Sequence, residues 1–152
     1  MRKYRFRLEP VLRYREILED LAHKRLADAQ RDHRQAVDAL AALCGRKDAL
    51  LVEMAESQQG KVSPTLVKQN MNYLAFLRSS IEKQALEVAR LAAIVEEKRL
   101  ALIETTKDKK AIERMRQHDF ERYMLEVRAV EQKFIDEVAT VRHTRALREE
   151  QL

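Results

Sequence analysis

Apolar side chains recur along the C-terminal stretch Glu113 to Ala139 at the spacing of one helix face. Spacings of three, four and seven among otherwise charged residues predict an amphipathic helix. Such a stripe needs a partner helix, which is either the first half of this chain or another protein. The stripe consists of Phe120, Met124, Val127, Phe134, Val138 and Val141.

The first half of the chain carries a comparable seam. After a lead-in of alternating apolar and basic residues at 1–8, Glu9 and Pro10 predict a helix start, because proline is tolerated in the first turn. We expect this helix to reach about Gln58, with Gly45 as a weak point. The seam is apolar at Leu8, Leu12, Ala22, Leu26, Ala29, Ala36, Leu40, Leu43, Leu50 and Met54, and its three alanines make the middle thin.

Residues 59–63 form the clearest break in the pattern. Gly60 predicts a helix C-cap, and Ser63 with Pro64 predicts the N-cap and first residue of the next helix. A second stripe follows at Leu74, Leu77, Ile81, Val88, Leu91, Val95 and Leu102.

The sequence allows two antiparallel registers. In a tight hairpin around Gly60, Leu12 would face roughly residue 110, and the stripe from Phe120 to Val141 would be exposed to water. We favour a shifted register, with paired positions summing to near 146, because it buries groups worth about 1.5 to 3 kcal/mol each. It places Leu8 against Val138, Leu12 against Phe134, and Phe120 against the thin Ala22 to Ala29 region.

In the shifted register, residues 58–88 lie outside the main pairing and form short helices at the distal end. Tyr73 and Phe76 would be displayed there, as a candidate binding pair or as packing among the short helices.

Composition supports an all-α fold of this kind. Of 152 residues, 36% are charged and 5% aromatic, with 2 Gly and 2 Pro, which is typical of long helices. We predict a long antiparallel two-helix coiled-coil hairpin, in which residues 58–88 either fold back as short helices at the distal tip or continue as one straight helix. It forms a single elongated domain over 1–152, with helices at about 9–58, 64–88 (the tip) and 89–149, and a break at 59–63.

The net charge of +5 is concentrated at the two chain ends. In the shifted register these ends form one positive tip, suited to an acidic partner surface or simply solvated. A basic run near Lys107 to Arg116 raises nucleic-acid binding as a rival, but interleaved acids disfavour it, and we expect no nucleic acid. The basic ends contain Arg2, Lys3, Arg5, Arg7, Arg13 and Arg15, and Arg142, Arg145 and Arg148.

No pattern of catalytic or metal-binding chemistry is present. The four histidines are scattered, Cys44 is the single cysteine, and there is no glycine-rich phosphate loop. We therefore expect no enzymatic activity, no cofactor and no metal. A single cysteine, which cannot form an internal disulfide, indicates a protein of the reducing cytosol. Because the sequence has no long apolar run, we expect neither secretion through a signal peptide nor insertion in a membrane.

Two blocks of the sequence are more specific than a generic heptad. Residues 6–16, FRLEPVLRYRE, and residues 107–139, with EQK at 131–133 followed by DEVA at 136–139, resemble the bacterial flagellar export proteins of the FliJ family. The resemblance covers nearly the whole chain.

The resemblance implies a non-enzymatic, stalk-like component of the flagellar type III protein export apparatus, and thereby of motility and chemotaxis. Family members are antiparallel coiled coils similar to the stalk of rotary ATPases. The implied partners are the hexameric export ATPase, the cytoplasmic domain of the export gate membrane protein, and export chaperones. The implied location is cytoplasmic, peripheral at the inner membrane beneath the flagellar basal body.

The resemblance also implies site residues. Ser80 stands where the family tends to show leucine, so Leu77 or Ile81 would replace it in the gate contact. The alternatives are the injectisome counterpart of the same stalk and a self-associating coiled-coil scaffold; otherwise we expect a monomeric hairpin. The ATPase-binding candidates are Arg7, Leu8, Val11, Leu12, Arg15, Glu131, Lys133, Asp136, Glu137 and Arg142, and the gate-binding candidates are Tyr73, Phe76, Leu77, Ser80 and Ile81.

Overall fold

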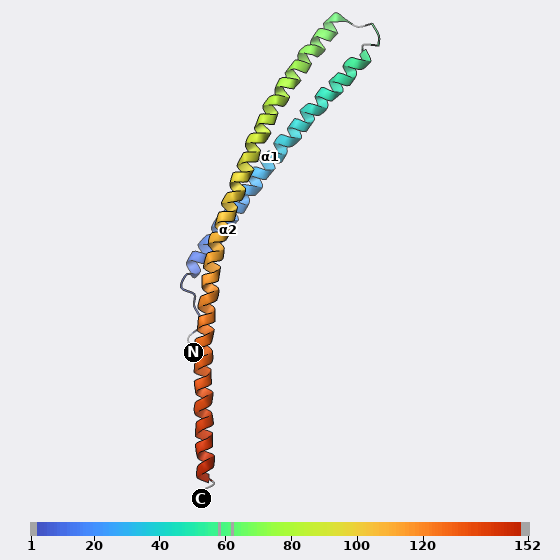
Figure 1. Cartoon of the computed structure of the whole chain (residues 1–152). Coiled ribbons are helices and arrows are strands. Elements are labelled where there is room, and N and C mark those ends of the chain that lie inside the picture. The colour runs from blue at the N-terminus through green and yellow to red at the C-terminus, as the bar shows by residue number, and fades with distance from the viewer. Residues whose placement is uncertain (1–2, 58, 62, 150–152) are drawn as a thin grey trace. The chain divides into compact units, whose positions relative to one another are not determined.

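A computed structural model of the chain contains two long helices joined by a short connector (Figure 1). Helix α1 spans Glu9–Ser57 and helix α2 spans Pro64–Glu149. The structure describes residues 3–57, 59–61 and 63–149, with side chains as far as Arg145, and it contains no strand within those ranges. The predicted all-α, antiparallel helical hairpin is confirmed.

The helix ends follow the local sequence. The amide of Leu12 donates to the carbonyl oxygen of Leu8 at 3.0 Å, so α1 begins at the predicted Glu9-Pro10 pair. The amide of Val67 donates to the carbonyl oxygen of Ser63 at 3.1 Å, which makes Ser63 the N-cap of α2. Gly60 lies in the connector beyond the end of α1 at Ser57 and has no positive φ, so it is not the helix C-cap that we predicted.

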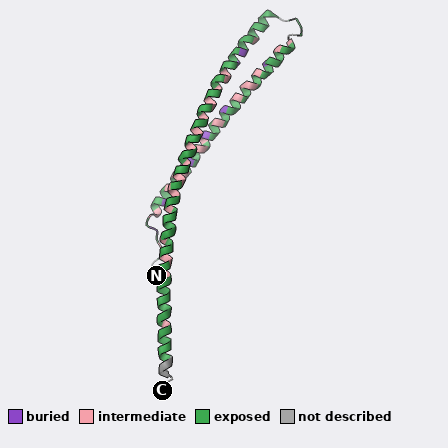
Figure 2. Cartoon of the chain, in the orientation of Figure 1, coloured by how far each residue is buried: buried purple, intermediate pink, exposed green. Residues whose placement is uncertain are grey.

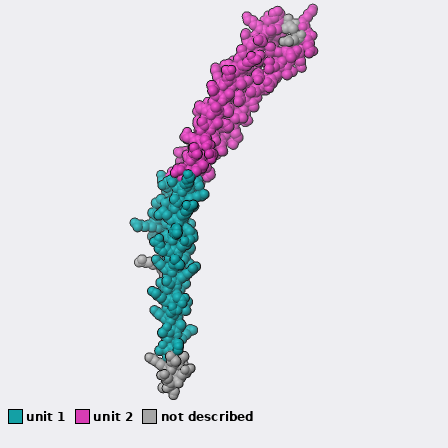
Figure 3. Space-filling model, in the orientation of Figure 1, with its two compact units in different colours: residues 1–17, 106–152 teal, residues 18–105 magenta. Residues whose placement is uncertain are grey.

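The chain divides into two units, each formed by segments of both helices (Figure 3). Unit 1 comprises Met1–Ile17 and Thr106–Leu152, and unit 2 comprises Leu18–Thr105. Each unit has its own contacts and is described separately.

Unit 2 is held by a single seam of buried side chains (Figure 2). Leu50, Leu74 and Leu77 form its core cluster, and Leu43 and Met54 pack against it. Ala22, Ala29 and Ala36 continue the buried line along α1, as the heptad pattern predicts. Leu77 is only 1% exposed, so its side chain is enclosed even though the seam is one layer thick.

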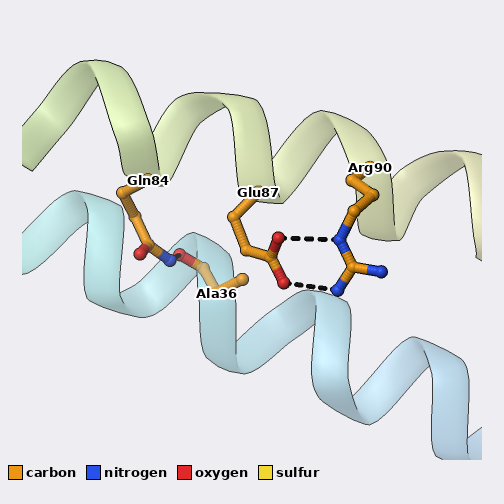
Figure 4. A network of polar contacts seen from close by, with 4 residues as sticks. All are labelled: Ala36, Gln84, Glu87 and Arg90. Carbon is orange, nitrogen blue, oxygen red and sulfur yellow. Dashed lines mark hydrogen bonds and ion pairs between the residues drawn. The ribbon is translucent and has the colours of Figure 1, made fainter.

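A side-chain hydrogen bond joins the two helices within unit 2. The Gln84 side-chain amide donates a hydrogen bond of 3.0 Å to the backbone carbonyl of Ala36 (Figure 4). Beside it, Glu87 accepts two hydrogen bonds from Arg90, at 2.7 and 2.6 Å, within α2. These bonds lower the pKa of the Glu87 carboxyl, but the pair lies within one helix and is exposed to solvent.

The register is that of the tight hairpin, so our preference for the shifted register is wrong. In unit 2, Ala36 lies opposite Gln84, where the shifted register required a residue near Lys110. In unit 1, Arg15 pairs with Asp108, where the shifted register required a residue near Glu131.

The physical reason is the short connector. Residues 58–63 span at most about 20 Å, whereas moving α2 by two dozen residues requires about 36 Å of helix. We expected residues 64–88 to supply that distance as separate helices. The described chain after Pro64 contains no Gly or Pro, and α2 continues through this region as one helix.

A substitution at Leu77 tests the seam. Leu77→Ala should lower the free energy of unfolding by about 2 to 4 kcal/mol, because it removes an enclosed side chain from the core cluster. Leu86, at 73% exposed on the same helix, provides the matched control, and Leu86→Ala should change stability by less than about 0.5 kcal/mol. Urea unfolding followed by circular dichroism measures both; equal effects would contradict this seam.

A second substitution tests the weak point in α1. A Cβ built at Gly45 has no neighbouring atom within 4 Å, so alanine is accommodated without strain. Gly45→Ala should raise the free energy of unfolding by about 0.5 to 1 kcal/mol, since glycine is the poorer helix former. Thermal unfolding measures the change, and a lower melting temperature would mean that the helix is not regular at this point.

Candidate partner-binding surfaces

The N-terminal segment, residues 3–8, packs against α2 in unit 1. The Tyr4 hydroxyl donates a hydrogen bond of 3.1 Å to the backbone carbonyl of Arg116. The Tyr4 ring meets Phe120 edge-on at 5.1 Å between centroids and Tyr123 at 5.4 Å. Phe6 is buried as well. The alternation of apolar and basic residues therefore marks an ordered segment whose aromatic side chains face α2.

The start of α1 is fixed in unit 1 by both apolar and ionic contacts. Leu12 is 2% exposed, and Arg15 donates to Asp108 at 2.7 Å. Arg116 also approaches Glu9 at 3.8 Å. Both ion pairs are partly exposed, so they orient the helices more than they stabilise them.

Beyond residue 124, α2 has an uncovered apolar face. Phe134 is 66% exposed, and the side chains of Glu131 and Val130 lie with it around a shallow groove of about 410 Å³. The N-terminal segment contacts α2 at Arg116, Phe120 and Tyr123, all before this face begins. Val130, Phe134 and Val141 are exposed on this face, Ile135 is exposed at its edge, and Leu125 is exposed on the opposite side of the helix.

The two groups of ATPase-binding candidates do not meet. Arg7 and Leu8 lie beside Met115 and His118, whereas the group from Glu131 to Arg142 is farther along α2. The predicted positive tip is therefore wrong, because it depended on the shifted register; Arg2 and Arg148 lie outside the described side chains. Leu8 against Val138 and Phe120 against Ala22 to Ala29 are wrong for the same reason, and Phe120 instead packs against Tyr4.

These candidates differ in how accessible they are. Leu12 is buried in the seam and serves packing, while Leu8 and Arg15 are half-buried. The remaining candidates are exposed, and Asp136 accepts a hydrogen bond from Gln132 on its own helix. The exposed set is Arg7, Val11, Glu131, Lys133, Asp136, Glu137 and Arg142.

Tyr73 and Phe76 form an exposed aromatic pair near the start of α2. Their rings are stacked, with centroids 6.3 Å apart and an interplanar angle of 14°. Leu77 is buried in the core cluster and offers no surface to a partner, so it does not replace a contact residue. Ser80 and Ile81 are half-buried at the edge of the seam.

Our sequence reasoning missed two surface features of unit 1. Tyr4 was not recognised as the partner of Phe120, although its place in the apolar alternation was a usable signal. Tyr14 and Ile17 are exposed beside the N-terminal segment and lie outside the seam. Their spacing of three residues was the available signal.

The described residues contain no group of three or more His, Cys, Asp or Glu side chains that could hold a metal ion. Neither α1 nor α2 has a stretch long and apolar enough to cross a bilayer.

Comparison with known proteins identifies one family. The family described as "Flagellar FliJ protein" matches residues 4–148. No curated protein and no solved structure matches the chain. The family match confirms the resemblance seen in residues 6–16 and 107–139.

Alkaline titration tests the packing of Tyr4. The pKa of its hydroxyl is raised above 10.0, first by partial burial and then by the nearby Asp119 carboxylate. Because the pKa of Tyr4 is higher in the folded than in the unfolded chain, packing of the neutral ring against α2 stabilises the fold fully below pH of about 10. This stabilisation is lost as the pH rises through the pKa of the folded chain. The difference in phenolate absorbance between the unchanged chain and Tyr4→Phe should show this raised midpoint.

The same difference titration in concentrated urea is the control, and its midpoint should fall to the ordinary tyrosine value. Equal midpoints in the folded and unfolded chains would show that the Tyr4 ring is not packed against α2.

Proposed function

The chain belongs to the FliJ family of flagellar export-related proteins, which are non-catalytic, and on this premise we propose that it is the stalk of the flagellar export ATPase. In this proposal the chain binds within the hexameric ATPase ring, promotes its assembly or turnover, and links it to the export gate. It performs no chemistry of its own.

The observation that supports an ATPase contact is the uncovered apolar face of α2. Phe134 and its apolar neighbours remain in water although each would be stabilised by burial. Exposed contiguous apolar side chains on a helix are typical of a protein-binding surface. Exposed Glu131, Lys133 and Glu137 flank this face and would determine orientation within a charged ring.

A single helix inside a six-fold ring can contact only some subunits at one time. The chain would therefore act at less than one copy per ATPase subunit. Arg7 in the N-terminal segment and Val11 near the start of α1 are both exposed, and they would contact the ring separately from Arg142. This replaces the common tip that the sequence suggested.

For the export gate, the proposed contact is the stacked pair Tyr73 and Phe76. Both rings are exposed, whereas the neighbouring Leu77 is buried in the core cluster of unit 2. The pair could therefore bind a partner without disturbing that core. Ser80 and Ile81 would line the edge of this contact. Binding of export chaperones is a further part of the proposal and rests on family membership alone.

The proposed location is the cytoplasmic face of the inner membrane at the flagellar base. A second candidate function is a self-associating scaffold, and the specific observation that favours it is again the uncovered face of α2, which a second copy could cover. An injectisome counterpart would use the same surfaces with a different ATPase.

ATPase turnover tests the main proposal. The purified cognate export ATPase should form rings and turn over faster when this chain is added below one copy per subunit. Phe134→Asp and Arg142→Glu should each reduce the stimulation by about fivefold or more, because each alters the exposed contact face of α2. Phosphate release and sedimentation of the ring measure the two effects.

Leu86→Asp is the matched control, since Leu86 is also exposed on α2 but lies in unit 2; it should leave stimulation unchanged. If the unchanged chain does not stimulate the ATPase, the proposal that it is the stalk of this enzyme is wrong. A stable dimer at low micromolar concentration, dispersed by Phe134→Asp, would favour the scaffold.

Binding to the cytoplasmic domain of the gate protein tests the second contact. Phe76→Ala should weaken this binding by about tenfold while leaving helicity and melting temperature unchanged, because the ring is exposed. Calorimetric titration measures the affinity. Unfolding of the variant, or unchanged affinity, would each show that Phe76 is not a gate contact.

A further inference from the structure

A groove of about 1280 Å³ lies between the N-terminal segment, the first turns of α1 and α2 in unit 1. It is separate from the uncovered face around Phe134. Its apolar lining comes from three elements: Tyr4 in the N-terminal segment, Pro10, Tyr14 and Ile17 on α1, and Phe120 on α2.

The apolar side chains of this groove remain exposed in the folded chain. Tyr14 is 58% exposed and Ile17 is 63% exposed. Together with Pro10 they stand at spacings of four and three, so they form one stripe on the face of α1 that does not enter the seam. An exposed stripe beside a concave surface is suited to the apolar face of another helix.

The charged side chains that line the groove are mostly positive. Arg5, Arg7, Arg13 and Arg116 line it, against the single carboxylate of Glu9. Glu9 already lies 3.8 Å from Arg116. Arg5 and Arg13 are exposed and form no ion pair with any described residue, so their charges are available to a partner.

We propose that this groove binds an acidic amphipathic helix of a partner protein. Apolar side chains of that helix would cover Tyr14 and Ile17, and carboxylates along its edges would pair with Arg5 and Arg13. The excess of positive charge requires an acidic partner. The exposed apolar stripe requires that this partner carry apolar side chains at helical spacing.

A nucleic acid fits this groove less well. Arginines and the Tyr14 ring would suit phosphates and bases, but Ile17 and Pro10 offer aliphatic surface that neither pairs with phosphate nor stacks on a base. An apolar peptide side chain gains from covering both kinds of surface.

The groove shares Arg7 with the proposed ATPase contact, but peptide binding to it requires neither the ATPase nor the gate. The proposal needs only the geometry of unit 1, and it can be tested with the purified full chain. Failure would leave the stalk proposal intact, and loss of the stalk proposal would leave this groove unchanged.

The experiment uses synthetic probes. A fluorescein-labelled helical peptide of about 15 to 20 residues, with leucines on one face and glutamates along the edges, is titrated with the chain and followed by anisotropy. Three further probes accompany it: the same peptide with leucines replaced by serines, the same peptide with glutamates replaced by lysines, and a single-stranded oligothymidylate.

Two variants locate the binding. Tyr14→Ser and Arg13→Glu should each weaken the acidic leucine peptide by about five- to tenfold. The matched controls are Leu86→Ser and Arg34→Glu, exposed positions in unit 2 that should leave affinity unchanged. Circular dichroism should show the same helicity for all four variants, because every altered side chain is exposed.

Preferential binding of the acidic leucine peptide, lost in both groove variants, would establish the proposal. Equal binding of the serine or lysine peptide would overturn it, as would tighter binding of the oligothymidylate. A dimer of the chain that Tyr14→Ser disperses would assign the groove to a second copy and would also overturn it.

Discussion

The short connector at 58–63 is the constraint on which the remaining structure depends. Because it cannot span more than about 20 Å, α2 must pair with the end of α1 from its first turns. Leu74 and Leu77 therefore meet Leu50, and the same antiparallel order brings Arg15 to Asp108 in unit 1. An uninterrupted α2 then leaves its C-terminal residues without a partner from α1.

That leftover helix face gives the molecule its most prominent candidate surface. The hydrophobic effect alone favours burial of Phe134 and Val141, but the short connector prevents α1 from reaching them. Exposed apolar side chains retained in this way have a physical rationale only if another protein covers them for part of the time. The chain belongs to a family of flagellar export-related proteins, and under the proposed function the covering partner would be the export ATPase.

Buried packing residues and exposed candidate binding residues lie side by side along both helices. Leu77 closes the core of unit 2, while Phe76 beside it points outward and stacks with Tyr73. Within unit 1, Leu12 fills the seam while Tyr14 and Ile17 remain on the opposite face of α1. A helix of period 3.6 permits this arrangement, because neighbouring residues occupy different faces. Partner surfaces can therefore change without loosening the seam.

The sequence by itself determined the all-α class, the helix start at Glu9-Pro10, the connector ending at Ser63-Pro64 and the buried alanines, because these depend on local periodicity and capping. It could not determine the register, since heptads of Leu and Ala pair almost equally well at several offsets. Only the tertiary structure decided that Phe120 packs against Tyr4, that Leu77 is enclosed and that Phe134 is exposed. The reason is that the short connector and an unbroken α2 select one offset, and that offset alone determines which apolar side chains find a partner within the chain.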